Sequence, residues 1–300
     1  MFPKRLRIEK FSATDGTLLY GLLALPDHGR ARTAVLHVHG LTGSFYGSTA
    51  IEELAAEMAR RGMAFFSIQT RGSYLVEEFT KRKGRTETDF IAGAAFERFG
   101  DCVHDIGGAV RFLRSMGFSS IILEGHSTGC QKVLYYNATH PGRLVKGIVL
   151  LAPVDDSNFD IARYGTRFAA LVSKAHALAR NSYALMPMER GFDAFIGASR
   201  FLSTADPKRD EGRVLNYLHR RMEYVERIRV PVFVAFGTED HFMRVPGIKP
   251  QYALRKLKES CPKPVTGLVI RGADHGFHGK RKLLARRVAG WIESLLAGKG

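Results

Sequence analysis

The chain has 300 residues, 45% hydrophobic and 25% charged, a composition typical of a folded globular protein. It holds no apolar run near the roughly 20 residues that span a bilayer, which argues against stable membrane insertion. Its formal net charge is +16, and we expect most of that charge to lie on a solvated surface, because no recognisable nucleic-acid-binding module accompanies it.

The predicted elements begin with two strands, RLRIEKFSA and TLLYGLLAL, which flank the turn Thr14-Asp15-Gly16 and predict an antiparallel hairpin. Six further apolar, β-branched runs follow, and near-continuous apolar strands of this kind are typical of parallel sheets that are covered on both faces. Helical patterns alternate with these runs, which favours a doubly wound α/β fold with helices on both faces of an eight-stranded sheet. The six runs cover residues 33–40, 63–70, 119–126, 146–153, 230–237 and 265–272.

Two connections are longer than plain loops. Residues 71–101 are rich in charge and glycine, and residues 154–229 contain several helical patterns rich in aromatic side chains and methionine. Long segments over the strand ends of an α/β sheet are usually lids or binding loops. We therefore expect a core formed by residues 1–153 and 230–300, with residues 154–229 as a helical lid.

The stretch GHSTG, residues 125–129, follows a predicted strand and opens a predicted helix. This is the context of a nucleophile elbow, in which the central serine, here Ser127, is exposed at a tight turn. Gly125 and Gly129 leave room where the turn brings strand and helix together. The helix that begins behind the serine favours negative charge at its N-terminus.

A serine nucleophile needs a base and an orienting carboxylate, which in this fold follow in the chain order Ser, acid, His. Asp240 follows the strand at 230–237 and His275 follows the strand at 265–272, so both residues lie where the pattern expects them. Other residues also lie near strand ends. The alternative acids are Glu239, Asp155 and Asp156, and the alternative bases are His278 and His241.

The oxyanion of such a reaction is bound by two backbone N–H groups. We expect one from Thr128, the residue after the nucleophile, and one from Leu41, which follows His39-Gly40 at the end of the strand at 33–40. No glycine-rich phosphate-binding pattern and no H-E-x-x-H pattern occurs. The sequence therefore predicts neither a cofactor nor a metal.

Taken together, HG after the strand at 33–40, GHSTG, GTEDHFMRVP and GADHGF resemble the α/β-hydrolase superfamily, in its esterase and lipase branch. GHSTGCQKVLYY and KGIVLLAPVDD are similar to a group that includes fungal esterases of fusarinine-type siderophores, with Gln131 after the elbow. Lys132 and the basic C-terminal segment depart from that group. The resemblance implies an α/β-hydrolase fold and a Ser-His-Asp triad of Ser127, His275 and Asp240.

The expected activity is hydrolysis of a small-molecule carboxylic ester through an acyl-enzyme. The aromatic side chains of the lid favour a small to medium acyl or aromatic substrate, although most of them are expected to form the lid's own core. The same triad serves thioesters, lactones and amides, and a non-catalytic ligand-binding protein on this fold is the alternative of another class. The substrate-contacting residues are not assigned. The aromatic and methionine residues are Phe159, Tyr164, Phe168, Tyr183, Met186, Met188, Phe192, Phe195 and Phe201.

The N-terminal stretch MFPKRLRIEKF lacks the apolar region of a secretory signal, and three cysteines without metal-ligand spacing indicate reduced thiols. We therefore expect a cytoplasmic protein with no nucleic-acid partner. The sequence does not fix the oligomeric state, and a homodimer is compatible with it.

Overall fold

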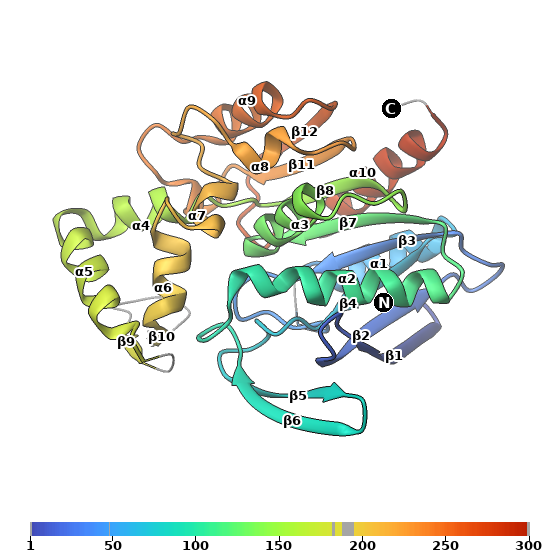
Figure 1. The fold of residues 1–300 in the computed structure, drawn as a ribbon. Coiled ribbons are helices and arrows are strands. Elements are labelled where there is room, and N and C mark those ends of the chain that lie inside the picture. The colour runs from blue at the N-terminus through green and yellow to red at the C-terminus, as the bar shows by residue number, and fades with distance from the viewer. Residues whose placement is uncertain (1, 48, 182–183, 188–194, 299–300) are drawn as a thin grey trace.

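The computed structural model describes residues 2–47, 49–181, 184–187 and 195–298, and of residues 185–187 and 195 the backbone alone. Eight strands form one sheet in the order β1-β2-β4-β3-β7-β8-β11-β12 (Figure 1). The predicted eight-stranded sheet is confirmed. Its strands are β1 (Arg5–Ser12), β2 (Leu18–Leu25), β3 (Thr33–Val38), β4 (Ala64–Ile68), β7 (Ser120–His126), β8 (Val145–Leu151), β11 (Val232–Gly237) and β12 (Val265–Ile270).

The sheet is mostly parallel. β1 pairs with β2 and β2 with β4 in antiparallel register, and the five remaining pairings are parallel. Every side chain of β3, β4 and β11 is buried, which explains why these segments read as continuous apolar runs. Parallel strands bring their carboxyl ends to one edge of the sheet, and the predicted nucleophile, acid and base follow three of those ends.

Helices cover both faces, as predicted. α1 (Ile51–Arg60) and α10 (Arg281–Leu296) enclose one apolar cluster with the sheet. α2 (Cys102–Ser115), α3 (Thr128–Thr139) and α9 (Pro250–Ser260) enclose the other cluster on the opposite face. Within the described residues, no helix combines the length and the apolar character needed to cross a bilayer.

The long connection at residues 71–101 contains a hairpin that the sequence patterns did not predict. β5 (Glu77–Lys83) pairs with β6 (Thr86–Ala92) in antiparallel register, and a short 3-10 helix, η1 (Phe99–Asp101), leads into α2. Figure 1 shows this hairpin extending away from the main sheet. Only Phe79 and Ala92 of its two strands are buried, so the segment lacks the apolar alternation by which a half-buried strand is predicted.

The chain between β8 and β11 folds mainly into helices. Ile196, Phe201 and Leu202 form a small apolar cluster with Tyr164 and Ala175, whereas Val214, Tyr217 and Ile228 belong to the main cluster under α3. In Figure 1 the first helices lie beside the sheet, on the side toward which β3 and β7 point. The elements are α4 (Asp156–Tyr164), η2 (Gly165–Arg167), α5 (Phe168–Leu178), β9 (Leu185–Pro187), β10 (Phe195–Gly197), α6 (Ala198–Ala205), α7 (Asp210–Val214) and α8 (Glu223–Glu226).

The aromatic residues of this segment take different places. Tyr164 and Phe201 lie in the segment's own cluster and Phe168 packs against it, as expected for most of the set. Phe159 instead contacts Phe242, with 4.8 Å between the ring centroids. Tyr183, Met188 and Phe192, and the side chains of Met186 and Phe195, lie outside the described residues.

Candidate active site

Ser127 sits at a strained turn between β7 and α3, with φ 54° and ψ −126°. A non-glycine residue holds such a conformation only where its surroundings determine it, and such residues cluster at functional sites. The flanking glycines are needed for close approach. A Cβ on Gly125 would lie 2.4 Å from the carbonyl carbon of Gly129, and a Cβ on Gly129 would lie 2.2 Å from the Val38 oxygen.

His275 and Asp240 come together from neighbouring strand ends. His275 Nδ1 lies 2.8 Å from Asp240 Oδ2, and Asp240 Oδ1 accepts the Phe242 N–H at 2.9 Å. The carboxylate is almost fully buried, so water competes little for this contact. Because the carboxylate accepts, Nδ1 carries the proton and Nε2 of His275 is left with a free lone pair.

Two rings flank the imidazole of His275. Its centroid lies 4.5 Å from the Phe242 ring and 4.9 Å from the His126 ring. These ring contacts, together with the bond to Asp240, restrict the orientation of the imidazole. His275 is therefore held in a defined orientation beside Asp240.

Ser127 and His275 line one cavity of about 390 Å³. In the described part of the chain no hydrogen bond joins them, and the bond between nucleophile and base often forms only once substrate is bound. The volume lies within the range of small-molecule sites. The remaining lining residues are Gly40, Leu41, Thr42, Gly43, Gly47, Thr49, His126, His241, Phe242, Asp274, Gly276 and His278.

The alternative acids lie elsewhere. Asp155 accepts the Tyr217 N–H at 2.7 Å and the Asn158 N–H at 3.1 Å, so it caps α4 and holds the returning chain. Asp156 is half-buried and accepts a hydrogen bond from the amide of Gln131, and desolvation raises its pKa well above the usual range. Glu239 is exposed.

The alternative bases are less enclosed. His278 is exposed and its Nδ1 lies 2.8 Å from Asp274 Oδ2, in a contact separate from Asp240. His241 lines the cavity, and its ring centroid is 5.9 Å from that of His275. Of these histidines, His275 is the one that the structure pairs with a buried carboxylate.

The candidate oxyanion donors, Leu41 and Thr128, come from two segments near Ser127. Leu41 lines the cavity and Thr128 opens α3 directly after Ser127. In the described part of the chain neither backbone N–H donates to another protein group, so both are available to a bound oxygen. Gly40 allows the approach, because a Cβ there would lie 2.8 Å from the Ser127 Cβ.

A family described as "Protein of unknown function (DUF1749)" matches residues 94–294, more than half of the chain. The chain belongs to this family. No curated protein matches it significantly in sequence.

Solved structures cover almost the whole chain. The siderophore hydrolase EstB from Aspergillus fumigatus aligns with a TM-score of 0.71 at 20% identity, over 98% of this chain and 100% of that chain. Est1E from Butyrivibrio proteoclasticus, solved with ferulic acid bound, gives 0.65 at 15% identity, over 96% and 99%. The esterase RhEst1 from Rhodococcus sp. ECU1013 gives 0.54 at 19% identity, over 96% and 99%. At these identities the likeness establishes the fold, so the predicted α/β-hydrolase fold is confirmed.

The loop that carries Leu41 is held by the buried His39. Its Nδ1 donates to the Gly40 oxygen at 2.7 Å, and its Nε2 lies 2.8 Å from Ser73 Oγ and 3.1 Å from Thr70 Oγ1. Burial lowers the pKa of His39 to about 3, so the ring is neutral in ordinary buffers. Its tautomer is then fixed, with the proton on Nδ1 and the hydroxyls donating to Nε2.

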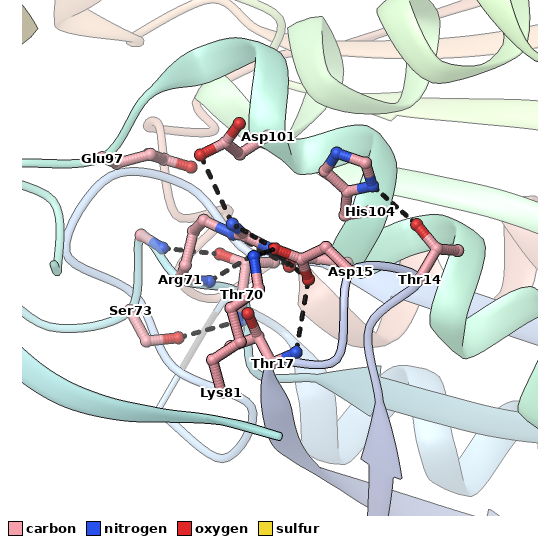
Figure 2. Close-up of polar contacts among 12 residues, drawn as sticks. Thr14, Asp15, Thr17, Thr70, Arg71, Ser73, Lys81, Glu97, Asp101 and His104 are labelled. Carbon is pink, nitrogen blue, oxygen red and sulfur yellow. Dashed lines mark hydrogen bonds and ion pairs between the residues drawn. The ribbon is translucent and has the colours of Figure 1, made fainter. Parts of the chain in front are cut away.

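The segment that supplies those hydroxyls is anchored by Arg71 (Figure 2). Arg71 Nη2 lies 2.8 Å from Asp105 Oδ1 on α2 and 3.2 Å from Asp15 Oδ1 in the β1–β2 turn. Asp101 and Lys81 complete the cluster, at 3.3 Å from Arg71 and 3.0 Å from Asp15. The guanidinium thus ties residues 70–73, and through His39 the loop beside Ser127, to three other parts of the fold.

A second buried cluster was not predicted. Lys132 on α3 pairs with Glu97, whose other oxygen lies 3.7 Å from Nη2 of Arg200 on α6. Arg200 in turn pairs with Glu211 on α7. The one sequence signal was Lys132 itself, a charged residue on the helix that follows the elbow, and its partner was not deducible from local pattern.

Proposed function

We propose that the chain is a serine hydrolase that cleaves carboxylic esters through Ser127, His275 and Asp240. The observation that carries the proposal is the hydrogen bond of His275 Nδ1 to the buried Asp240, with His275 and the strained Ser127 on one cavity. This arrangement leaves His275 Nε2 as the base beside a serine at an elbow. The α/β-hydrolase fold supports the proposal, because the three residues follow strand ends where that fold carries its triad.

In the proposed reaction, His275 Nε2 accepts the hydroxyl proton while Ser127 Oγ attacks the acyl carbonyl carbon. Asp240 keeps the imidazole in the Nδ1–H tautomer and stabilises its positive charge. The N–H groups of Leu41 and Thr128 bind the carbonyl oxygen as it becomes negative. Collapse expels the alcohol, which takes the proton from His275, and water then releases the acid from the acyl-serine through the same base.

The proposed substrate is a small to medium ester with an acyl or aromatic group. The cavity of about 390 Å³ supports this size. The similar structures include a siderophore hydrolase and an esterase with ferulic acid bound, and both are consistent with an ester that is larger than a simple acetate. We further propose that residues 154–229 act as the cap of this site, since Phe159 reaches Phe242 beside the base.

We also propose a cytoplasmic location. Cys102, Cys130 and Cys261 are all buried and unpaired with one another, as expected of thiols that stay reduced. Burial raises the pKa of each thiol above its usual range, which makes them poor nucleophiles.

The test is the initial rate on p-nitrophenyl esters from acetate to palmitate, for the wild type and Ser127→Ala. We expect turnover in the wild type, a loss of at least about 10⁴-fold in the variant, and labelling of Ser127 by a fluorophosphonate. Labelling without turnover would move the proposal to thioesters, lactones or amides. The absence of both labelling and turnover would refute the serine mechanism and would favour a ligand-binding role.

A further inference from the structure

His126, the residue before the nucleophile, contacts the base as well. It is the last residue of β7 and is almost fully buried, yet it is one of the residues that line the cavity with Ser127. His126 Nε2 lies 2.9 Å from the backbone oxygen of His275. Because a carbonyl oxygen only accepts, Nε2 carries the proton and donates it. One side chain therefore links the strand of the nucleophile to the backbone of the base.

The loops that carry the acid and the base are joined to each other. The Glu239 N–H donates to the Ala273 oxygen at 2.9 Å, and the Gly272 N–H donates to Thr238 Oγ1 at 2.9 Å. Together with the bond between His275 and Asp240, these contacts make the two loops a single unit. Three hydrogen bonds thus fix the position of the base relative to the acid.

The position of the base relative to the nucleophile has less support. The other hydrogen bonds described for residues 271–280 run to the loop of the acid, remain within the loop or lead into α10. The bond from His126 to the His275 oxygen is the one described for this loop that reaches β7. It therefore ties the unit of acid and base to the elbow.

The His126 side chain also keeps one protonation state. Burial, and the nearby His275, lower the pKa of His126 well below its usual value. The ring therefore stays neutral where an imidazole base works, and it adds no positive charge beside His275. A neutral, buried donor holds the loop without opposing the protonation of the base during the reaction.

We propose that His126 is a positioning residue, which sets the separation of Ser127 Oγ and His275 Nε2 by holding the backbone of the base loop. This inference rests on the proposed function. Its physical basis is that a misplacement of about 1 Å between reacting groups costs on the order of 10²-fold in rate. Since Ser127 is the next residue in the chain, this hydrogen bond fixes the position of His275 relative to Ser127.

Two substitutions separate the donor from the ring. His126→Gln places an amide N–H the same number of bonds from Cα as Nε2, so it retains the donor. His126→Phe retains a ring against His275 and removes the donor. We expect H126Q to keep kcat within a few-fold of the wild type, and H126F to lose about 10- to 100-fold in kcat with KM changed less than about threefold.

Rates are expressed per active site titrated with a fluorophosphonate, so that a fraction of unfolded protein does not enter kcat. A purely structural role would lower the melting temperature and the titrated fraction in both variants and leave kcat per site unchanged. That result would overturn the inference, and so would equal kcat values for H126Q and H126F.

A second readout does not need turnover. The Nδ1 proton of His275, hydrogen-bonded to Asp240, should give a low-field proton NMR resonance that is lost in His275→Gln. We expect it to persist in both H126Q and H126F, because the hydrogen bonds that join the loops of the acid and the base do not involve His126. If the wild type neither hydrolyses nor labels, the proposed function fails, while this resonance still tests whether His275 and Asp240 form a pair. Loss of the resonance in H126F would overturn the inference, because the lower kcat would then come from a broken pair of His275 and Asp240.

Discussion

Lys132 Nζ lies 2.5 Å from Glu97 Oε1, and both side chains are 99% shielded from solvent. The pair joins α3, the helix that follows Ser127, to the segment before α2, and Arg200 extends the cluster into the chain between β8 and β11. The attraction of the cations lowers the pKa of Glu97 despite its burial. The carboxylates of Glu97 and Glu211 thus balance the positive charges of Lys132 and Arg200 where α3 meets the proposed cap.

Removing one member of the pair leaves an uncompensated charge in a dry environment. We predict that Lys132→Met and Glu97→Gln each lower the free energy of unfolding by about 3 to 5 kcal/mol. The double variant should lose clearly less than the sum, because neither charge is then left alone. Urea unfolding of the four proteins measures this coupling.

The control is the exposed pair of Arg82 and Glu87 on the β5–β6 hairpin. The same cycle with Arg82→Met and Glu87→Gln should give a coupling below about 1 kcal/mol, since solvent screens both groups. Additive losses at Lys132 and Glu97 would contradict the prediction and show that the pair is not energetically coupled.

The sheet was predictable because strands that are buried on both faces have continuous apolar sequences, as in residues 33–40 and 146–153. The turn at Ser127 was predictable for a similar reason, since the close approach of strand and helix demands small residues at Gly125 and Gly129. The chain order of the fold then predicted a pair of Asp240 and His275, and the structure brings these two side chains within 2.8 Å.

The features that the sequence did not predict depend on contacts between segments that are distant in the chain. Glu97 and Lys132 meet because the topology brings the start of α2 beside α3, and neither position carries a local pattern that names the other. Asp155 and Asp240 both follow strands, and the sequence favoured Asp240 but kept Asp155 as an alternative acid. Only the three-dimensional arrangement shows that one carboxylate caps a helix and the other meets a histidine.

These two carboxylates support a direct comparison. We predict that Asp240→Asn lowers kcat by about 10³- to 10⁴-fold, because the amide no longer selects the Nδ1–H tautomer of His275. Asp155→Asn removes acceptors from Tyr217 and Asn158 and should lower the free energy of unfolding by about 1 to 3 kcal/mol. In its folded fraction kcat should stay within a few-fold of the wild type.

The measurement pairs ester hydrolysis per titrated site with urea unfolding of both variants. The prediction requires that Asp240→Asn loses activity and that Asp155→Asn loses stability. A larger loss of kcat in Asp155→Asn than in Asp240→Asn would instead assign Asp155 as the acid of the triad.

Asp160 gives α4 a dependence on pH. Its side chain is buried, and burial raises its pKa to about 7, partly opposed by Arg163. In the unfolded chain an aspartate titrates near pH 4. Between about pH 4 and 7 the folded protein therefore binds more protons than the unfolded one, so this group makes stability fall as pH rises.

We predict that Asp160→Asn, which remains neutral, raises the free energy of unfolding by about 2 to 4 kcal/mol at pH 8 and by less than about 1 kcal/mol at pH 4.5. The gain is full above pH 7, where the buried carboxylate of the wild type is charged. Urea unfolding at the two pH values measures it. Asp89→Asn, at an exposed position of β6, should change stability by less than about 0.5 kcal/mol at both. An equal effect of Asp160→Asn at the two pH values would show that packing at position 160, and not ionisation, sets its cost.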